Sequence, residues 1–388
     1  MNKTCFFYIF LASVLALAAS CKSTDDPEPT PPSAPAPRTV LVYMVANNNL
    51  GSNDFDAADI AEMKRAAKNG DIADGRMVVY HAGYNSAPVL LEITAGGADT
   101  LKTYDRSVLS VEAARMGDVF ADLKKLAPAD DYGLVLWSHG TGWIHDGIAG
   151  DSRKRSFGLE NGRTMNTSTL ASVIAAAPVD FSFLYFDCCY MMSVETLYEL
   201  RNAVPLVAGS ATELPSPGQR YDLNVSRFFA MPQADITGAA TNTFNEYNSF
   251  FGSDRTCTMS VVNTAGIAAL ASATRAVYEA CGGGIPAGYT PQRFSWTSVA
   301  SCRYFDMRDY IHSLCESAGR DDLRTAFDEA FDAAVLYAAA TPKLWNAVDL
   351  DRHNGISTFI LTGPDAVNTG NYNQLEWYAD VASAIKFE

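Results

Sequence analysis

The chain has 388 residues, of which 48% are hydrophobic and 19% charged, a balance typical of a folded protein and too apolar for a disordered one. Its formal charge of −15 argues against a nucleic-acid partner, because phosphate binding needs a basic face that this composition supplies only locally. A chain of this length can bury a large core, either as one α/β unit or as two domains.

Residues 1–20 are predicted to be a targeting segment and not part of the fold. Lys3 is followed by an apolar run and by small residues directly before Cys21, and the run is too short and too weakly flanked for a membrane span. LALAASC resembles a bacterial lipobox, whose cysteine is lipidated and becomes the mature N-terminus, with Ala18 where leucine is commonest. A plain secretory signal with an incidental cysteine is the alternative.

Residues 21–37 are predicted to be a tether, and they favour the lipid anchor at Cys21. The segment is rich in proline and acid, so it should be extended and unable to pack. Its KSTDD resembles the acidic signal that sends some lipoproteins of Bacteroidetes-type bacteria to the cell surface. We therefore expect a lipoprotein of the outer membrane, in the cell envelope of a diderm bacterium, whose only membrane contact is its anchor.

From residue 38 onward the sequence predicts a largely parallel sheet covered by helices on both faces. Continuous apolar strands that alternate with helices indicate this arrangement. Residues 89–97 and 101–106 predict a short hairpin-like excursion, and residues 145–167 are polar and irregular. Buried strands are expected at residues 39–46, 77–83, 132–143, 181–189 and 206–211, and helices at residues 59–67, 110–126 and 168–177.

The run FSFLYFDCC at residues 181–189 is predicted to be the centre of the fold. It ends in Asp187 and two cysteines and is followed by apolar residues at helical spacing, which places Cys189 where a strand becomes a helix. A thiol at a helix N-terminus has a lowered pKa and forms the nucleophilic thiolate more readily. The alternative is that the cysteine pair only packs in the core.

A histidine is predicted to lie at the same edge of the sheet as Cys189. His139 follows the third strand in a Ser-His-Gly turn, and active sites of parallel sheets lie at the carboxyl ends of the strands. Histidine can take the proton of a thiol and return it to the leaving amine. His81, after the second strand, is the rival base. The glycines beside His139 allow close approach of a substrate and favour His139.

Three stretches resemble the clostripain family of bacterial cysteine peptidases, whose fold is similar to that of caspases and gingipains. They are RTVLVYMVANNNL, WSHGTGW around His139 and FDCCYMMSVE around Cys189, and shorter matches follow at residues 259–270, 304–314 and 353–361. The resemblance implies a caspase-like three-layer α/β sandwich with a mainly parallel central sheet. Its catalytic domain would span residues 38–232, and residues 233–388 would form a C-terminal α/β subdomain that completes the fold.

The resemblance also implies a cysteine endopeptidase that hydrolyses peptides or proteins through a dyad of His139 and Cys189. The backbone N–H groups of Gly140 and Cys189 would form the oxyanion hole, and Cys188, which replaces an alanine, would be structural. We expect a monomer without a cofactor or metal, since the sequence has neither a Cys-x-x-Cys pair nor a calcium loop of EF-hand type.

Asp187 is the candidate specificity residue. Strand alternation puts it on the same face as Cys189, and the family places there an acid that contacts a basic side chain at P1, the residue before the cleaved bond. Capping of the following helix is the alternative role. Relatives often have more acids in the loop after the next strand. Here that loop has only Glu213 and Asp222, with Arg220 between them, which makes Glu213 a second substrate-binding candidate and counts against basic specificity.

The densest basic cluster of the chain consists of Arg153, Lys154 and Arg155. Relatives are often activated by self-cleavage in the loop after the histidine, so this cluster is a candidate processing site. An ordinary solvated loop is the alternative.

Four later cysteines are candidates for disulfides. In an oxidising compartment they allow two bridges in three possible connectivities. The four are Cys257, Cys281, Cys302 and Cys315.

A second class of function is a surface-binding lipoprotein that keeps the fold but has little turnover. Retention of both His139 and Cys189 argues against it.

Overall fold

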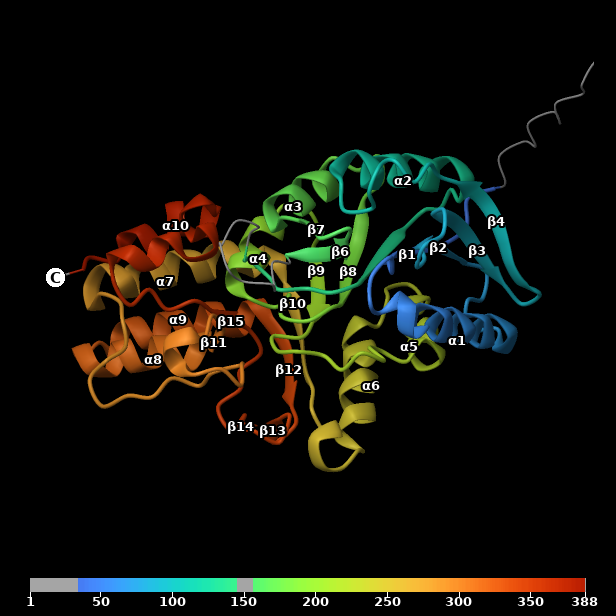
Figure 1. Cartoon of the computed structure of the whole chain (residues 1–388). Helices are drawn as coiled ribbons and strands as arrows, with labels where there is room; N and C mark the ends of the chain where they lie inside the picture. Colours follow the sequence, from blue (N-terminus) through green and yellow to red (C-terminus); the bar gives the residue numbers. More distant parts are fainter. Residues whose placement is uncertain (1–33, 145–155, 388) are drawn as a thin grey trace, which may run out of the picture. The chain divides into compact units, whose positions relative to one another are not determined.

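A nine-stranded sheet runs through the computed structural model, which describes residues 34–144 and 156–387 (Figure 1). The five neighbouring strands β9, β8, β5, β1 and β2 are parallel, and antiparallel strands extend the sheet at both ends. The predicted, mainly parallel sheet is therefore confirmed. In the order of the sheet, its strands are β12 (Val335–Ala340), β10 (Thr258–Asn263), β9 (Leu206–Gly209), β8 (Phe181–Asp187), β5 (Tyr132–Trp137), β1 (Thr39–Val45), β2 (Arg76–Ala82), β3 (Val89–Thr94) and β4 (Gly97–Thr103).

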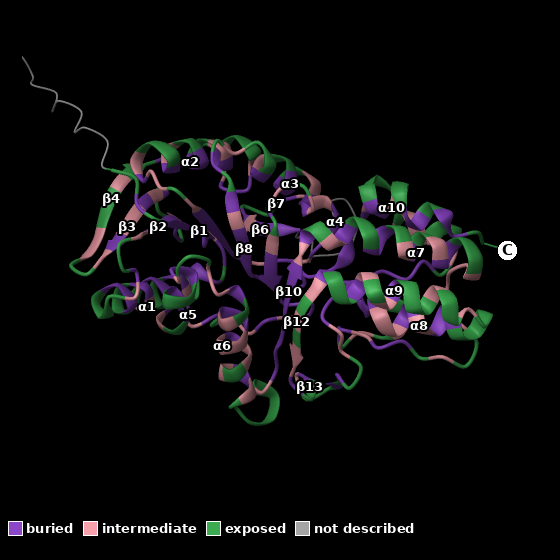
Figure 2. Cartoon of the chain, turned by 180° about the vertical axis from the view of Figure 1, so that it is seen from behind, coloured by how far each residue is buried: buried purple, intermediate pink, exposed green. Residues whose placement is uncertain are grey.

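The central strands are apolar on both faces because each face packs against its own core. In β1, Tyr43 and Val45 belong to one cluster of buried side chains, whereas Val42 and Met44 belong to another. Side chains alternate across a strand, so two covered faces require a continuous apolar run. Figure 2 shows these strands as buried, between helices whose outer faces are exposed.

Helices cover both faces and complete a three-layer sandwich. One layer packs on the cluster that contains Val42, and the other, larger layer packs on the cluster that contains Tyr43. The first layer consists of α1 (Phe55–Asn69), α5 (Tyr221–Phe228) and α6 (Ile236–Asn248). The second consists of α2 (Ala113–Leu126), α3 (Thr167–Ala175), α4 (Val194–Leu200), α7 (Ile267–Cys281), α8 (Met307–Ala318), α9 (Asp321–Ala334) and α10 (Glu376–Asp380).

Segments from both sides of Pro232 build the same sheet, since β10 and β12 pair beyond β9. The described residues, 34–144 and 156–387, belong to one compact unit. No helix within the two described ranges is long and apolar enough to cross a membrane.

The predicted hairpin is confirmed as β3 and β4, which pair with each other, and β3 also pairs with β2, so that the hairpin extends the main sheet. Shorter ribbons lie outside the main sheet. Part of the segment predicted to be irregular forms a second hairpin, β6 (Phe157–Glu160) with β7 (Arg163–Met165). Two further ribbons pair β11 (Phe305–Asp306) with β15 (Ser357–Thr358) and β13 (Lys343–Leu344) with β14 (Val348–Asp349).

Arg38 fixes the entry of the chain into β1. Its side chain is only 2% exposed, forms an ion pair with Asp131 and donates to the carbonyl oxygens of Phe228, at 2.9 Å, and Ala230, at 2.6 Å. A buried guanidinium needs such partners for its N–H groups. The residue before β1 thus joins the loop before β5 to the end of α5.

Candidate active site

A cavity of about 450 Å³ lies at the carboxyl ends of the parallel strands. Residues that directly follow β5 and β8 line it, among them His139 and Cys189, and a loop residue after β1, Leu50, joins them. Further walls come from the loop after β9 and from residues 295–304 and 345. The expected position for the active site of a parallel sheet is therefore occupied by the predicted pair.

His139 and Cys189 lie beside each other because β5 and β8 end in register. Trp137 is paired with Asp187 in the parallel ladder, and each candidate follows its strand end by two residues. Neighbouring strands are about 4.8 Å apart, so the two residues leave the sheet side by side. The structure thus brings together the two residues that the sequence proposed as a dyad.

Cys189 does not lie at the start of a helix, so the prediction of a strand-to-helix junction is wrong. Strand β8 ends at Asp187, α4 begins at Val194, and its N-cap is Ser193, whose Oγ accepts from the Thr196 N–H at 3.3 Å. The intervening residues form a turn because their N–H groups are bonded to the loop after β9. The Tyr190 N–H donates to the Thr212 carbonyl at 2.9 Å. A helix dipole therefore does not account for reactivity at Cys189.

The loop after β9 meets the sulfur of Cys189. The Leu214 N–H lies 3.4 Å from Sγ, and the Leu214 carbonyl oxygen lies 3.6 Å from it. A thiol can donate to that carbonyl, whereas a thiolate can only accept, from the N–H. A backbone donor directed at sulfur favours the charged form of the nucleophile.

Asn49 contacts the imidazole of His139 and was not anticipated from the sequence. Its Oδ1 lies 2.7 Å from Nε2 of His139. With Oδ1 as acceptor, Nε2 carries a proton and Nδ1 becomes the basic nitrogen. The only signal in the sequence was the asparagine run after the first strand, which belongs to a stretch that resembles the family.

Gly140 is required by its close approach to the cysteine turn. A Cβ at this position would lie 2.5 Å from the carbonyl oxygen of Cys189 and 3.0 Å from the Cβ of Cys188. The bridge between Gly140 and Phe157 uses the N–H groups of Thr141 and Gly158, so the N–H of Gly140 is not part of that bridge. This geometry suits the proposed oxyanion donor.

Cys188 has the surroundings of a packing residue. It is buried, and its Sγ donates to the Leu136 carbonyl at 3.0 Å. Burial raises its pKa well above the ordinary value for a thiol, which keeps it protonated and a poor nucleophile.

Asp187 lines the cavity and is almost fully buried, with 5% of its surface exposed. Its carboxylate accepts from the Gln219 N–H at 3.1 Å and from the Tyr221 hydroxyl at 3.2 Å. A Cβ at Gly218 would lie 2.5 Å from Oδ1, so the loop after β9 packs closely on this carboxylate. Asp187 does not cap α4, which Ser193 caps.

Asp187 acts electrostatically on a second buried carboxyl group, that of Asp59 on α1. Asp59 accepts from Nε1 of Trp137 at 2.6 Å. Burial, followed by the charge of Asp187, raises the pKa of Asp59, and burial also raises the pKa of Asp187. Burial therefore favours the neutral form of both carboxyl groups, and a cation bound near them would favour ionisation instead. Sequence reasoning missed Asp59, because helical spacing alone does not show which sheet residue it meets.

Glu213 also lines the cavity, whereas Arg220 and Asp222 do not. Arg220 forms ion pairs with Asp222 at 2.9 Å, Glu62 at 3.0 Å and Glu246 at 3.2 Å. Its charge is therefore compensated by acids of its own surroundings. Arg220 therefore does not bring its charge to the cavity lining, and what counts against basic specificity is the small number of acids in this loop.

The rival base His81 lies outside the cavity lining. Its Nε2 is 2.6 Å from Oδ2 of Asp56 on α1, so it joins β2 to that helix. Three further predictions, lipidation of Cys21, the tether, and processing at Arg153, Lys154 and Arg155, fall on segments outside the described residues apart from the last four tether positions, residues 34–37.

Comparison with known proteins identifies the family. The clostripain family model matches residues 42–321, and no curated protein sequence matches the chain. An inactive zymogen of a C11 protease from Parabacteroides distasonis has a similar structure, with a TM-score of 0.76, 27% identity and coverage of 90% of this chain and 99% of that one. A secreted C11 cysteine protease from Bacteroides thetaiotaomicron, in complex with an irreversible peptide inhibitor, has a TM-score of 0.74 and 28% identity over 89% of this chain and 99% of that one.

A third structure, also of a secreted C11 cysteine protease from Bacteroides thetaiotaomicron, shares the fold with a TM-score of 0.77 at 20% identity, over 90% of this chain and 100% of that one. The expected caspase-like architecture is therefore confirmed. Because the family model alone matches most of the sequence, the chain belongs to the clostripain family and is a cysteine-type peptidase.

Proposed function

We propose that this peptidase is an endopeptidase that cleaves after arginine or lysine. The observation that carries the proposal is the buried carboxylate of Asp187, which lines the same cavity as Cys189 and lies near a second acid, Asp59. A guanidinium or ammonium group bound there would favour the charged form of Asp187 and pair with it.

Arg303 also lines the cavity and brings a positive charge to it. Its guanidinium donates to the Cys302 carbonyl at 3.1 Å and lies 5.7 Å from the centre of the Phe359 ring. Asp187 and Glu213 place two carboxyl groups in the cavity against this one guanidinium.

The proposed reaction is acyl transfer. Sγ of Cys189 attacks the carbonyl carbon of the P1 residue, and His139 takes the thiol proton and gives it to the leaving amine. The N–H groups of Gly140 and Cys189 stabilise the negative charge on the substrate oxygen. Water then hydrolyses the thioester and releases the acid product.

We further propose that the chain is made as a zymogen, cut near Arg153, Lys154 and Arg155, and held at the cell envelope by a lipid on Cys21. The relative from Parabacteroides distasonis is described as an inactive zymogen. The basic cluster lies between His139 and Cys189 in the sequence and matches the proposed P1 preference.

The activity is tested with fluorogenic peptides that end in Arg, Lys, Asp or Ala, each measured before and after limited trypsin treatment of the protein. We expect hydrolysis of the Arg and Lys peptides by the wild type and none by Cys189→Ala. Cys188→Ala is the matched control and should retain activity, since its sulfur only packs. Equal hydrolysis by Cys189→Ala, or none by either preparation of the wild type, would refute the proposal. Either outcome would instead favour the alternative function, a surface-binding lipoprotein with little turnover.

Processing is tested by comparing intact masses of the wild type, Cys189→Ala and a triple variant with alanine at 153, 154 and 155. We expect two fragments from the wild type and a single chain from both variants. Single chains from all three proteins would rule out self-cleavage. Labelling with a radioactive fatty acid in a diderm host, with Cys21→Ser as control, tests the anchor.

A further inference from the structure

A second hollow of about 330 Å³ adjoins the active-site cavity and shares two of its wall residues. It is lined by Glu213, Trp296, Trp345 and Ala347, and both Glu213 and Trp345 also line the first cavity. Its walls are apolar apart from the one carboxylate. A peptide held at Cys189 therefore has an apolar hollow next to its binding site.

Trp345 reaches this position through an unusual backbone conformation. It lies at the tip of the β13–β14 ribbon with φ of +49°, and Asn346 follows with φ of +54°. The turn is closed by the Ala347 N–H, which donates to the Leu344 carbonyl at 2.9 Å. Turns of this kind normally have asparagine and glycine at their centre, and a bulky residue in the left-handed region is uncommon. Such conformations gather at functional sites.

Two hydrogen bonds fix Trp345 in place. Its backbone N–H donates to Oγ1 of Thr256 at 3.0 Å, and its indole N–H donates to Oε2 of Glu213 at 2.6 Å. Since Oε2 of Glu213 accepts from the indole, the ring positions the carboxylate, and Trp345 itself lines the hollow. The favoured occupant is therefore an apolar side chain and not a second cation.

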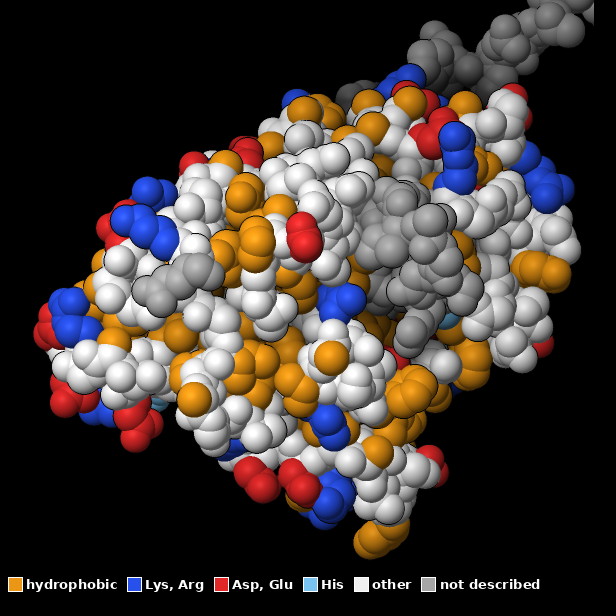
Figure 3. Space-filling view, turned by 60° about the vertical axis from the view of Figure 1, so that its left-hand side comes forward, with side chains coloured by type: hydrophobic (Ala, Val, Ile, Leu, Met, Phe, Trp, Pro, Cys, Tyr) orange, Lys and Arg blue, Asp and Glu red, His pale blue; other side chains and the backbone are white. Residues whose placement is uncertain are grey.

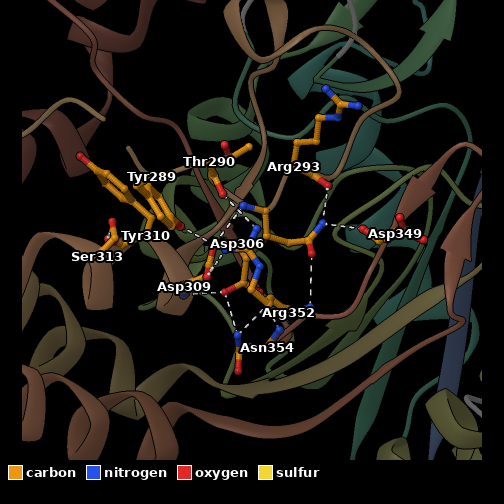
Figure 4. A network of polar contacts seen from close by, with 11 residues as sticks. Tyr289, Thr290, Arg293, Asp306, Asp309, Tyr310, Ser313, Asp349, Arg352 and Asn354 are labelled. Carbon is orange, nitrogen blue, oxygen red and sulfur yellow. Dashed lines mark hydrogen bonds and ion pairs between the residues drawn. The ribbon is translucent and has the colours of Figure 1, made fainter. Parts of the chain in front are cut away.

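Trp296 lines the same hollow and is 56% exposed. Its segment is held at both ends. A backbone hydrogen bond joins the residues on either side of Trp296: the Phe294 N–H donates to the Tyr304 carbonyl at 2.9 Å. Before Trp296, the network in Figure 4 ties the segment to α8 and to the loop before β15.

Asp309 on α8 is the centre of that network. It accepts from the Tyr289 hydroxyl, from the Gln292 N–H at 2.9 Å and from Nη1 of Arg352 at 2.8 Å. Arg352 also donates to the Thr290 carbonyl at 2.9 Å. An exposed indole on a segment fastened in this way keeps its position without a ligand, which is typical of binding surfaces.

We propose that Trp296 and Trp345 form a second substrate subsite, which binds an apolar or aromatic side chain that flanks the P1 residue. This inference rests on the proposed peptidase function, because the occupant is another residue of the peptide bound at Cys189. Tryptophan supplies a large rigid contact area, and aromatic side chains stack well on it.

The test uses internally quenched peptides with a single arginine. Phe, Leu, Ala or Asp is placed in turn at each of the flanking positions on both sides of the cleaved bond, and kcat/KM is measured. For one position, we expect wild-type kcat/KM to be about tenfold higher with Phe or Leu than with Asp. Trp296→Ala and Trp345→Gly should each reduce that ratio to about twofold.

The variants are chosen so that folding and binding can be separated. Glycine at 345 adopts positive φ freely, so the turn survives without the ring. Trp345→Phe keeps an aromatic face and should keep most of the preference. Phe251→Ala removes another ring, 89% exposed and outside both cavities, and should change nothing.

The outcomes distinguish the inference from the proposed function. Cleavage after arginine without any flanking preference would overturn the subsite alone. An equal loss for every peptide in both tryptophan variants would show that the rings only support the fold, and would overturn it too. If trypsin-treated wild type cleaves no peptide, the proposed function fails and the subsite fails with it.

Discussion

Under the proposed function, substrate choice depends on the carboxylate of Asp187. It is buried, it lines the cavity, and burial raises its pKa. An acid in this state is poorly solvated, so a cationic ligand gains more from pairing with it than it would at the surface.

Asp187→Asn is therefore expected to lower kcat/KM for arginine peptides by about a hundredfold. The amide keeps the shape and the acceptor oxygen but removes the charge. Steady-state kinetics with arginine and alanine peptides provide the measurement. Asp222→Asn is the matched control, since Asp222 pairs with Arg220 outside the cavity. Comparable losses in both variants would assign the effect to general charge.

Glu195 on α4 gives a prediction about stability and pH. Burial raises its pKa to about 7, and its Oε1 accepts from the Phe359 N–H at 2.7 Å. In an unfolded chain the pKa is about 4.3. The folded state thus binds this proton more tightly, and the resulting stabilisation is complete below about pH 4 and lost as pH rises to about 7.

Urea unfolding at about pH 5 and pH 8 tests this. The wild type should lose stability between the two, with Glu195 contributing about 2 to 3 kcal/mol. Glu195→Gln should show a smaller loss, because glutamine does not titrate. Burial also raises the pKa of Asp306 to about 7. Its titration lowers stability in the same pH range, so Glu195→Gln should keep part of the pH dependence. An unchanged slope in Glu195→Gln would contradict the assignment.

At the scale of elements, the close contact between two turns makes the position of Gly140 critical. A Cβ there would meet backbone atoms that cannot move aside. Gly140→Ala should therefore displace the oxyanion donor and reduce kcat about a hundredfold, with near-native circular dichroism.

Gly117→Ala on α2 is the control for that experiment. A Cβ there meets nothing within 4 Å, and alanine favours a helix over glycine by about 1 kcal/mol. This variant should be slightly more stable and fully active. Full activity of Gly140→Ala would show that the turns can separate without harm.

The packing of the helices limits disulfide formation to one pair. Cys257 belongs to the core cluster on one face of the sheet, whereas Cys302 and Cys315 belong to the cluster on the other, against which Cys281 also packs. Two bridges would use all four cysteines, so Cys257 would have to bond to a cysteine on the other face of the sheet. None of the three predicted connectivities therefore fits. Cys281 at the end of α7 and Cys315 on α8 have thiols that interact.

Oxidised glutathione should therefore link Cys281 to Cys315, with the two thiols losing their hydrogens and the glutathione disulfide being reduced. In the chain-entropy model, the bridge would add roughly 3 to 4 kcal/mol of stability. Peptide mapping without reductant and thermal unfolding provide the measurements, with Cys281→Ser as control. Mapping that finds both thiols free after oxidation would count against it.

How far the sequence predicts the structure differs from element to element. Continuous apolar runs correctly predicted β1, β5 and β8, because a buried strand leaves a direct compositional signal. The turn after Asp187 was misread as a helix. Met191 and Val194 have helical spacing, but hydrogen bonds to the distant loop after β9 hold the turn, and no local pattern shows such bonds.

The sequence predicted the site residues that lie within recognisable motifs. It did not predict those that only the packing of distant elements places at the site. His139, Cys189 and Asp187 follow strands within recognisable motifs. Asn49, Asp59 and Trp345 come from the loop after β1, from α1 and from the β13–β14 ribbon, and their roles depend on contacts between elements far apart in the sequence.

At the scale of the whole molecule, charge should influence how fast substrates arrive. The chain carries a net charge of −15. Figure 3 shows a face on which hydrophobic side chains gather across the middle and charged ones lie mostly toward the edges. An acidic protein with carboxylates in its cleft attracts cationic peptides over a distance set by the salt.

We therefore expect kcat/KM for arginine-rich peptides to fall severalfold between about 0.05 and 0.5 M salt. A peptide with one arginine and acidic flanks should show a flat or opposite dependence. Stopped-assay rates at fixed pH provide the measurement. Identical salt dependence for both peptides would show that the field of the protein does not steer binding.

The position of Arg38 has a mechanical consequence. It lies directly before β1, a strand with parallel neighbours on both sides, and is clamped to Asp131 and to the end of α5. A force that pulls on the N-terminal side of the chain would act first on the contacts of Arg38. It would then shear the hydrogen bonds of β1 to both neighbouring strands together, instead of breaking these bonds one by one. A protein held by that end would resist tension where the load enters it.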